Sequence, residues 1–295
     1  MRYLTAFLAM SLAAANVRAA PDPLTAPIVS PYAARWLRPV PPVHIHGNTY
    51  YAGFGGLAIV LINTSAGLVL VDGALPQSVA ALEANVRQLG FDIKDVRVIL
   101  NTEAHFDHAG GIAALARDSG AITLASSAGA EALRRGAVRA DDPQAGAIAD
   151  FPPVARVRAL ADGATHTLGD TVITAHATPG HTPGSMSWSW QSCEHGQCVD
   201  VVFGASLNAV SSDAFRFGDP ARQAALAGFR EGIARFGRLP CAILVTAHPD
   251  HSGFDQKLAG KQPYIDPQAC HSYAAKYAQK LDDRLAKEAA ADPVR

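Results

Sequence analysis

The sequence predicts an α/β fold, and two observations lead to this prediction. Short apolar runs rich in Val, Ile and Leu alternate with longer segments of helical character, in two successive rounds. The chain has 295 residues, of which 49% are hydrophobic, and this supports a substantial core. We therefore expect a single domain over residues 20–295, made of two similar halves.

The first half begins with paired strands. Three β-favouring runs, at 50–51, 57–62 and 68–71, are separated by Gly-Gly and by Asn-Thr-Ser-Ala-Gly. A helix is expected over 76–90, because proline suits its first turn and Gly90 its end. The apolar run Val96–Leu100 then predicts a short buried strand.

The second half repeats this order. Residues 154–177 and 185–190 have strand character, and Ala242–Thr246 predicts a buried strand. An Asp-Pro pair opens each of two helices, one running from Asp219 to Phe236 and the last beginning at Asp266.

Residues 136–153 lie between the two halves and contain glycine, proline, adjacent aspartates and little periodicity. We interpret them as a mobile loop. A connection without any function is an equally open alternative.

The most informative segment follows the predicted strand Val96–Leu100. Residues 101–111 read Asn-Thr-Glu-Ala-His-Phe-Asp-His-Ala-Gly-Gly, and a helix over 109–117 would place its N-terminus beside the Asp107 carboxylate. Zinc prefers imidazole nitrogen and carboxylate oxygen, and this loop offers both. Two further histidines stand where apolar runs give way to turn residues. The candidate ligands are Glu103, His105, Asp107, His108, His181 and His248.

These motifs carry a family resemblance. From Trp36 to the C-terminal helix the chain resembles the metallo-beta-lactamase superfamily, and more narrowly the subclass B3 beta-lactamases of class B. The resemblance rests on four motifs, which are Glu103-Ala-His-Phe-Asp-His108, Ala177-Thr-Pro-Gly-His-Thr-Pro-Gly-Ser185, Ser206-Leu-Asn208, and Leu239-Pro-Cys241 leading to His248-Pro. The resemblance implies a four-layer αββα sandwich with a dinuclear zinc site on one sheet edge.

The resemblance also assigns roles. Glu103, His105 and His181 would hold one zinc ion. Asp107, His108 and His248 would hold the other, and Asp107 would also orient the attacking water as a catalytic residue. Zinc lowers the pKa of bound water from ~15.7 towards ~7. Ser206 and Asn208 would hydrogen-bond the carboxylate of a beta-lactam substrate.

Two departures from related families matter. Glyoxalase-II-like and lactonase-like relatives usually have an aspartate after a Val-Phe-Gly strand. Here Phe203-Gly-Ala-Ser206 contains no acid, as in subclass B3. Subclass B3 usually has histidine where this chain has Glu103. Because an anionic ligand reduces the charge of the metal, we expect weaker Lewis acidity at the first zinc, or partial occupancy of that site.

The implied function is zinc-dependent hydrolysis of the amide bond of penicillins, cephalosporins and carbapenems, which confers antibiotic resistance. Two alternatives stay open. One is an exported metallohydrolase of the same fold that acts on esters or lactones. The other is a non-catalytic zinc-binding protein, for which Glu103 is the feature in favour.

The N-terminus predicts export. Arg2, the apolar stretch 3–15 and the small-residue site Val17-Arg18-Ala19 are typical of a signal peptide over 1–19, although a short membrane anchor or a buried helix would share this pattern. We expect a periplasmic protein. No apolar run reaches the ~20 residues that span a bilayer.

The net charge of −1 and the absence of a basic stripe exclude nucleic acid as an expected partner. We expect the protein to be a monomer.

The four cysteines agree with an oxidising compartment. Cys193 and Cys198 are close enough for a hairpin clip, and Cys241 and Cys270 could join a strand to the last helix. We favour these two disulfides, although the sequence alone allows three connectivities.

Trp36 lies upstream of the strands and could flank the active-site cleft. Packing in the core or on the surface is equally open for this residue.

Overall fold

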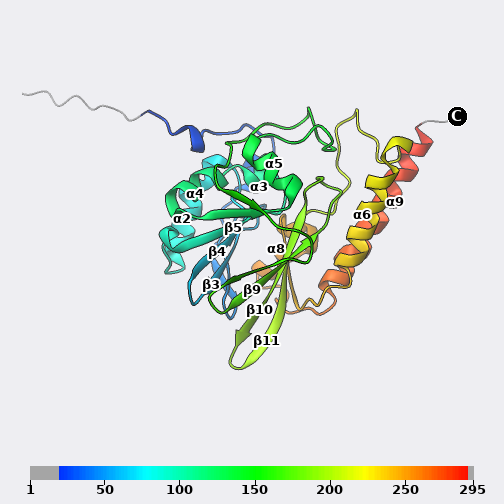
Figure 1. Cartoon of the computed structure of the whole chain (residues 1–295). Helices are drawn as coiled ribbons and strands as arrows, with labels where there is room; N and C mark the ends of the chain where they lie inside the picture. Colours follow the sequence, from blue (N-terminus) through cyan, green and yellow to red (C-terminus); the bar gives the residue numbers. More distant parts are fainter. Residues whose placement is uncertain (1–19, 292–295) are drawn as a thin grey trace, which may run out of the picture.

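The computed structural model describes residues 20–291, so the predicted signal peptide of residues 1–19 lies outside the described residues. Two β-sheets lie face to face, and helices cover the outer face of each (Figure 1). The expected four-layer αββα sandwich is confirmed.

The first sheet has seven strands that follow one another in sequence order. The pairs from β1 to β4 are antiparallel, and those from β4 to β7 are parallel. The strands are β1 (Val43–His46), β2 (Thr49–Tyr51), β3 (Val60–Thr64), β4 (Gly67–Val71), β5 (Val96–Leu100), β6 (Ile122–Ala125) and β7 (Val157–Ala159).

The second sheet has five strands in the order β12-β11-β10-β9-β8. Its pairs are antiparallel except for β11 and β12, which are parallel. The strands are β8 (Thr165–Leu168), β9 (Thr171–Ala177), β10 (Met186–Glu194), β11 (Gln197–Gly204) and β12 (Ile243–Thr246).

Two of the expected helices begin with a short 3-10 turn. The expected helix over 76–90 is a 3-10 turn, Pro76–Ser78, followed by α2, and the one expected from Asp219 likewise begins with the turn Pro220–Arg222. The α-helices are α1 (Ala33–Trp36), α2 (Val79–Gln88), α3 (Phe106–Ala109), α4 (Ile112–Ser119), α5 (Ser127–Arg135), α6 (Gln223–Phe236), α7 (Pro249–Ser252), α8 (Phe254–Leu258) and α9 (Ala269–Ala290).

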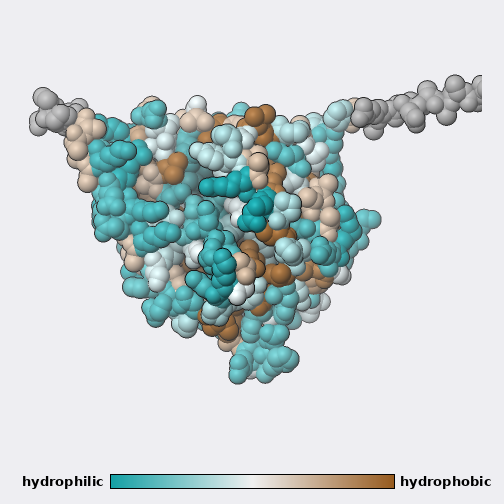
Figure 2. Space-filling model, turned by 180° about the vertical axis from the view of Figure 1, so that it is seen from behind, coloured by the Kyte–Doolittle hydropathy of each residue, from teal (hydrophilic) through white to brown (hydrophobic). Residues whose placement is uncertain are grey.

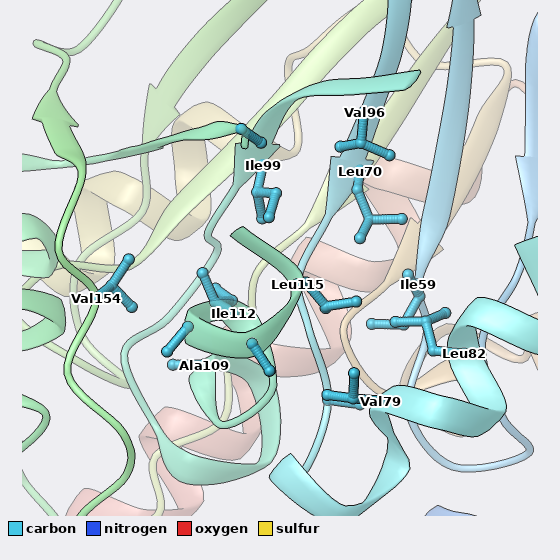
Figure 3. Packing of buried hydrophobic residues seen from close by; sticks show 14 of the residues in the cluster. Ile59, Leu70, Val79, Leu82, Val96, Ile99, Ala109, Ile112, Leu115 and Val154 are labelled. Carbon is cyan, nitrogen blue, oxygen red and sulfur yellow. The ribbon is translucent and has the colours of Figure 1, made fainter. Parts of the chain in front are cut away.

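The layers follow from the two-residue period of the strands, because successive side chains point to opposite faces. In β4, Leu68 and Leu70 pack under the outer helices, whereas Val69 and Val71 pack between the sheets. Figure 3 shows the outer cluster, in which Leu82 of α2 and the α4 side chains meet the strands. Both faces of the strand are apolar, since both are buried.

The second sheet is built in the same way. Trp188, Phe203 and Val245 point into the core between the sheets, whereas Val202 and Leu244 pack against α6 and α9. The two long helices α6 and α9 lie side by side on this outer face (Figure 1).

The expected helix over 109–117 is instead two helices, α3 and α4, separated by Gly110 and Gly111. Close backbone packing explains the glycines. A Cβ atom on Gly111 would lie 2.2 Å from the carbonyl oxygen of Gly73, and one on Gly110 would lie 2.3 Å from that of Phe106. The Gly73 N–H also donates to the His108 carbonyl at 2.8 Å, which fixes α3 against the end of β4.

Both expected disulfides are present. Cys193–Cys198 joins directly paired residues of β10 and β11, and the hydrophilic end of this hairpin projects at the lower edge of Figure 2. Cys241–Cys270 ties the segment before β12 to α9. Among residues 20–291, no helix has the length and apolar character needed to cross a membrane.

Candidate metal centre

The predicted ligands converge at one end of the sandwich, where β5, β11 and β12 end. Glu103 lies in the loop after β5, and His248 comes just after β12. His181 lies in the connection between β9 and β10. Strand ends of this kind give a rigid base for loops that carry site residues.

Glu103, His105 and His181 form a first cluster. Their potential ligand atoms all lie within 4.8 Å of one another, and all three residues are buried. The distance from Glu103 Oε1 to His181 Nε2 is 3.6 Å. The structure therefore brings together the three side chains expected to hold the first ion.

Asp107, His108 and His248 form a second cluster beside it. The Nε2 atoms of the two histidines are 3.2 Å apart, and Asp107 Oδ2 lies 3.4 Å from each of them. Glu103 Oε1 is only 3.1 Å from His108 Nε2. Glu103 thus also forms a group of potential ligands with His108 and His248, whereas the family resemblance assigns it to the first ion alone.

Backbone carbonyls fix the rings of two histidines. His181 Nδ1 donates to the carbonyl of Asn208 at 3.0 Å, and His248 Nδ1 donates to that of Gly56 at 2.9 Å. A carbonyl oxygen can only accept, so the proton of each neutral ring is on Nδ1. Each Nε2 is left with a free lone pair, as a metal ligand requires.

Two buried carboxylates missed by the sequence analysis support the other histidines. Both oxygens of Asp142 lie 3.2 Å from His105 Nε2. Asp72 Oδ2 lies 3.7 Å from His108 Nδ1, and the Asp72 carboxylate accepts from the Thr102 N–H at 2.8 Å. The available signals were weak, because one aspartate directly follows β4 and the other lies in the 136–153 loop.

The carboxylates make this region attractive to cations. Burial opposes protonation of His108, but the carboxylates of Asp107 and Glu103 outweigh it and raise the pKa of His108 to about 10. Burial likewise opposes ionisation of Asp107, but His108 holds the pKa of Asp107 well below its usual range. A metal ion would compete with this proton for His108 Nε2. Buried imidazole and carboxylate donors fit a divalent transition-metal ion.

The two residues expected to contact substrate lie at different depths. Ser206 is 1% exposed, and its N–H and hydroxyl both donate to Glu103, at 2.7 and 2.9 Å. Asn208 is half-buried and lines the cleft. Its Oδ1 is buried and has no hydrogen-bond partner among the described residues.

A cleft of about 510 Å³ gives access to both clusters. The 136–153 segment, which we predicted to be a mobile loop, lines it with Gln144 and Ile148. Trp36 lines the same cleft, and its ring centroid is 5.7 Å from that of His248. Trp36 also packs against the outer hydrophobic core, so it combines the two placements left open for it.

Comparisons with known proteins agree with this geometry. The family model of the metallo-beta-lactamase superfamily matches residues 52–212. A solved structure described as the first B3 metallo-beta-lactamase with an active site glutamic acid is 49% identical, with a TM-score of 0.86, over 91% of this chain and 99% of that one. MEM-A1, a subclass B3 metallo-beta-lactamase from a soil metagenome library, is 44% identical with a TM-score of 0.82, over 86% and 99% of the two chains.

A curated relative is more distant. The hydroxyacylglutathione hydrolase of Anaeromyxobacter dehalogenans is 32% identical over 203 residues, which cover 68% of this chain. The chain spans 59% to 62% of the length of the curated relatives that it matches.

Proposed function

Because the chain belongs to the metallo-beta-lactamase superfamily, and within it to subclass B3, we propose that it hydrolyses the amide bond of beta-lactam antibiotics with zinc as its cofactor. The substrates are penicillins, cephalosporins and carbapenems, and the activity confers resistance to them. The observation that carries the proposal is a pair of buried groups of potential metal ligands that share Glu103, one with His105 and His181 and the other with His108 and His248.

We assign two zinc ions to these clusters. Glu103, His105 and His181 hold the first. Asp107, His108 and His248 hold the second. Support for this assignment comes from the donor types and from the fixed rings of the histidines at 181 and 248, whose Nε2 atoms are left free.

When bound, zinc supplies a nucleophilic water near neutral pH and polarises a carbonyl group. The protein side chains provide orientation. Asp107, whose carboxylate stays ionised, accepts a hydrogen bond from the attacking water and aims it at the lactam carbonyl. Asn208 lines the cleft, where its amide can donate to the carboxylate of the substrate. Trp36 and Ile148 give the cleft apolar walls.

We further propose that residues 1–19 are a cleaved signal peptide and that the mature enzyme is a periplasmic monomer. The two disulfides support this compartment, because disulfides persist where the surroundings are oxidising.

The test uses purified mature protein. The loss of imipenem absorbance is followed with and without a chelator, and we expect chelation to abolish hydrolysis and added zinc to restore it. Hydrolysis of an ester or lactone, together with no turnover of any penicillin or carbapenem, would instead support the ester-hydrolase alternative. Zinc binding without turnover of either class would indicate a non-catalytic protein.

A further inference from the structure

Glu103 and Ser206 form a matched pair at the base of the metal centre. The Ser206 N–H donates to Glu103 Oε2 at 2.7 Å, and the Ser206 hydroxyl donates to Oε1 at 2.9 Å. Glu103 is fully buried and Ser206 is 1% exposed, so water does not compete for these bonds. Hydrogen bonds to an ionised carboxylate are roughly twice as strong as those between neutral groups.

The two bonds fix the orientation of the carboxylate. Both oxygens are held at once, so the group cannot rotate about its last torsion without breaking a bond. In this orientation Oε1 lies 3.1 Å from His108 Nε2 and 3.6 Å from His181 Nε2, among the nitrogens that would surround the metal.

This arrangement depends on glutamate at position 103. A carboxylate has about four acceptor sites, so it can accept two hydrogen bonds and still bind a metal ion. A neutral imidazole has one acceptor nitrogen, and a metal ion would occupy it. A histidine at 103 could therefore not accept both bonds from Ser206.

We propose that Ser206 is a positioning residue for Glu103, which holds the exchanged ligand in its metal-binding orientation rather than binding the substrate. This inference rests on the proposed function, because it concerns the zinc ligands of that same site. It competes directly with the role that the resemblance implies for Ser206. The serine hydroxyl has a single proton, and while it donates to Glu103 it cannot also donate to a substrate carboxylate.

A double-mutant cycle separates the two roles. Zinc affinity is measured by titrating metal-free protein against a chromophoric chelator, for wild type, Ser206→Ala, Glu103→His and the double variant. We expect Ser206→Ala to weaken zinc binding about 10- to 100-fold beside Glu103, the usual effect of losing a group that orients a ligand. In the Glu103→His background we expect the same change to have less than about a threefold effect. Ser206→Thr, which keeps the hydroxyl, should restore wild-type affinity.

The control is Ser192→Ala, which removes another buried serine hydroxyl, one bonded to the His46 carbonyl. It should leave zinc affinity unchanged. If Ser206→Ala does not fold, Ser206→Gly serves in its place, because it also removes the hydroxyl donor and adds no metal ligand.

The outcome that overturns the inference is unchanged zinc affinity in both backgrounds, with a KM for a cephalosporin that rises equally in both. That result would place the hydroxyl on the substrate. Zinc affinities that follow the expected cycle in a protein that turns over no beta-lactam would overturn the proposed function and leave the pairing of Ser206 with Glu103 intact.

Discussion

Both carboxylate oxygens of Asp142 lie 3.2 Å from Nε2 of His105, and the two side chains are buried together. The carboxylate can only accept, so it fixes the proton on Nε2 and leaves Nδ1 for a metal ion. The orientation of one proposed zinc ligand thus depends on the loop that lines the cleft.

Replacing Asp142 with alanine should weaken zinc binding about 10- to 100-fold, because His105 loses the partner that orients its ring. Beta-lactam hydrolysis should fall at limiting zinc and recover when zinc is in excess. The affinity is measured by competition with a chelator. Asp141→Ala is the matched control, since this neighbouring aspartate is exposed and paired with Arg139. Equal losses in the two variants would refute a specific role for Asp142.

Replacing Glu103 with histidine should increase the zinc content of the purified protein and its turnover of beta-lactams. Imidazole suits zinc better than a carboxylate does, which raises the zinc content. A neutral ligand also leaves the first zinc a stronger Lewis acid than an anionic one does, which raises the turnover. Zinc is measured by elemental analysis, and turnover at a fixed zinc concentration. If neither quantity changes, the glutamate does not weaken the first site.

Replacing Trp36 with alanine should raise KM about tenfold and change kcat by less than about threefold. The reason is that its ring forms a wall of the cleft and contacts the bound substrate. Trp36→Phe should recover most of the affinity. The ring also lies beside His248, with centroids 5.7 Å apart. A fall in kcat with an unchanged KM would therefore show that the indole supports the metal ligand instead.

Replacing Glu288 with glutamine should destabilise the protein at neutral pH. Burial opposes ionisation of this carboxylate, but the N–H groups of Gly218 and Phe217 and the Arg284 guanidinium outweigh it and lower its pKa. A lowered folded-state pKa stabilises the fold above the unfolded value of about 4.3, and this stabilisation is lost as pH falls through the folded value.

The unfolding free energies of wild type and Glu288→Gln should therefore differ by about 1.5–3 kcal/mol at pH 7, the range for hydrogen bonds to charged groups. The difference should shrink as pH falls below about 5. Glu231→Gln, on the exposed face of α6, should show no such trend. If the difference in unfolding free energy does not depend on pH, the charge of Glu288 does not stabilise the fold.

Loss of the Cys241–Cys270 disulfide should cost more stability than loss of Cys193–Cys198. The two bridges close loops with sequence separations of 29 and 5 residues. Chain entropy gives about 3.6 and about 2 kcal/mol for such loops. Urea unfolding of the two double-serine variants checks the order, and a larger loss from the hairpin bridge would argue against the entropic explanation.

Much of the fold could be predicted from local pattern. Val96–Leu100 was predicted with its observed bounds, because an apolar, β-branched run stands between charged residues and a polar loop. By contrast, β6 and α5 were not anticipated. Helix α5 buries mainly small side chains, such as Ala130 and Ala132, so its apolar face is weakly marked. Its capping residues, Ser126 and Gly136, were the usable signal.

The candidate metal ligands could be named from the sequence because they lie in short motifs, and the structure places all six side chains close together. Their supporting partners could not. Whether Asp142 meets His105 depends on the path of a loop, and no local pattern encodes that path. Whether Ser206 faces the cleft or Glu103 depends on its depth beneath the surface, which only the packed structure supplies.

The glycine contact between β4 and the start of α4 bears on how such an enzyme can evolve. Gly73, Gly110 and Gly111 offer no side chain to metal or drug, yet a methyl group on any of them would collide with neighbouring atoms. In a library of randomised codons selected for survival on an antibiotic, these positions should stay as invariant as the histidines. Survival data alone would then wrongly suggest that these three packing glycines take part in catalysis.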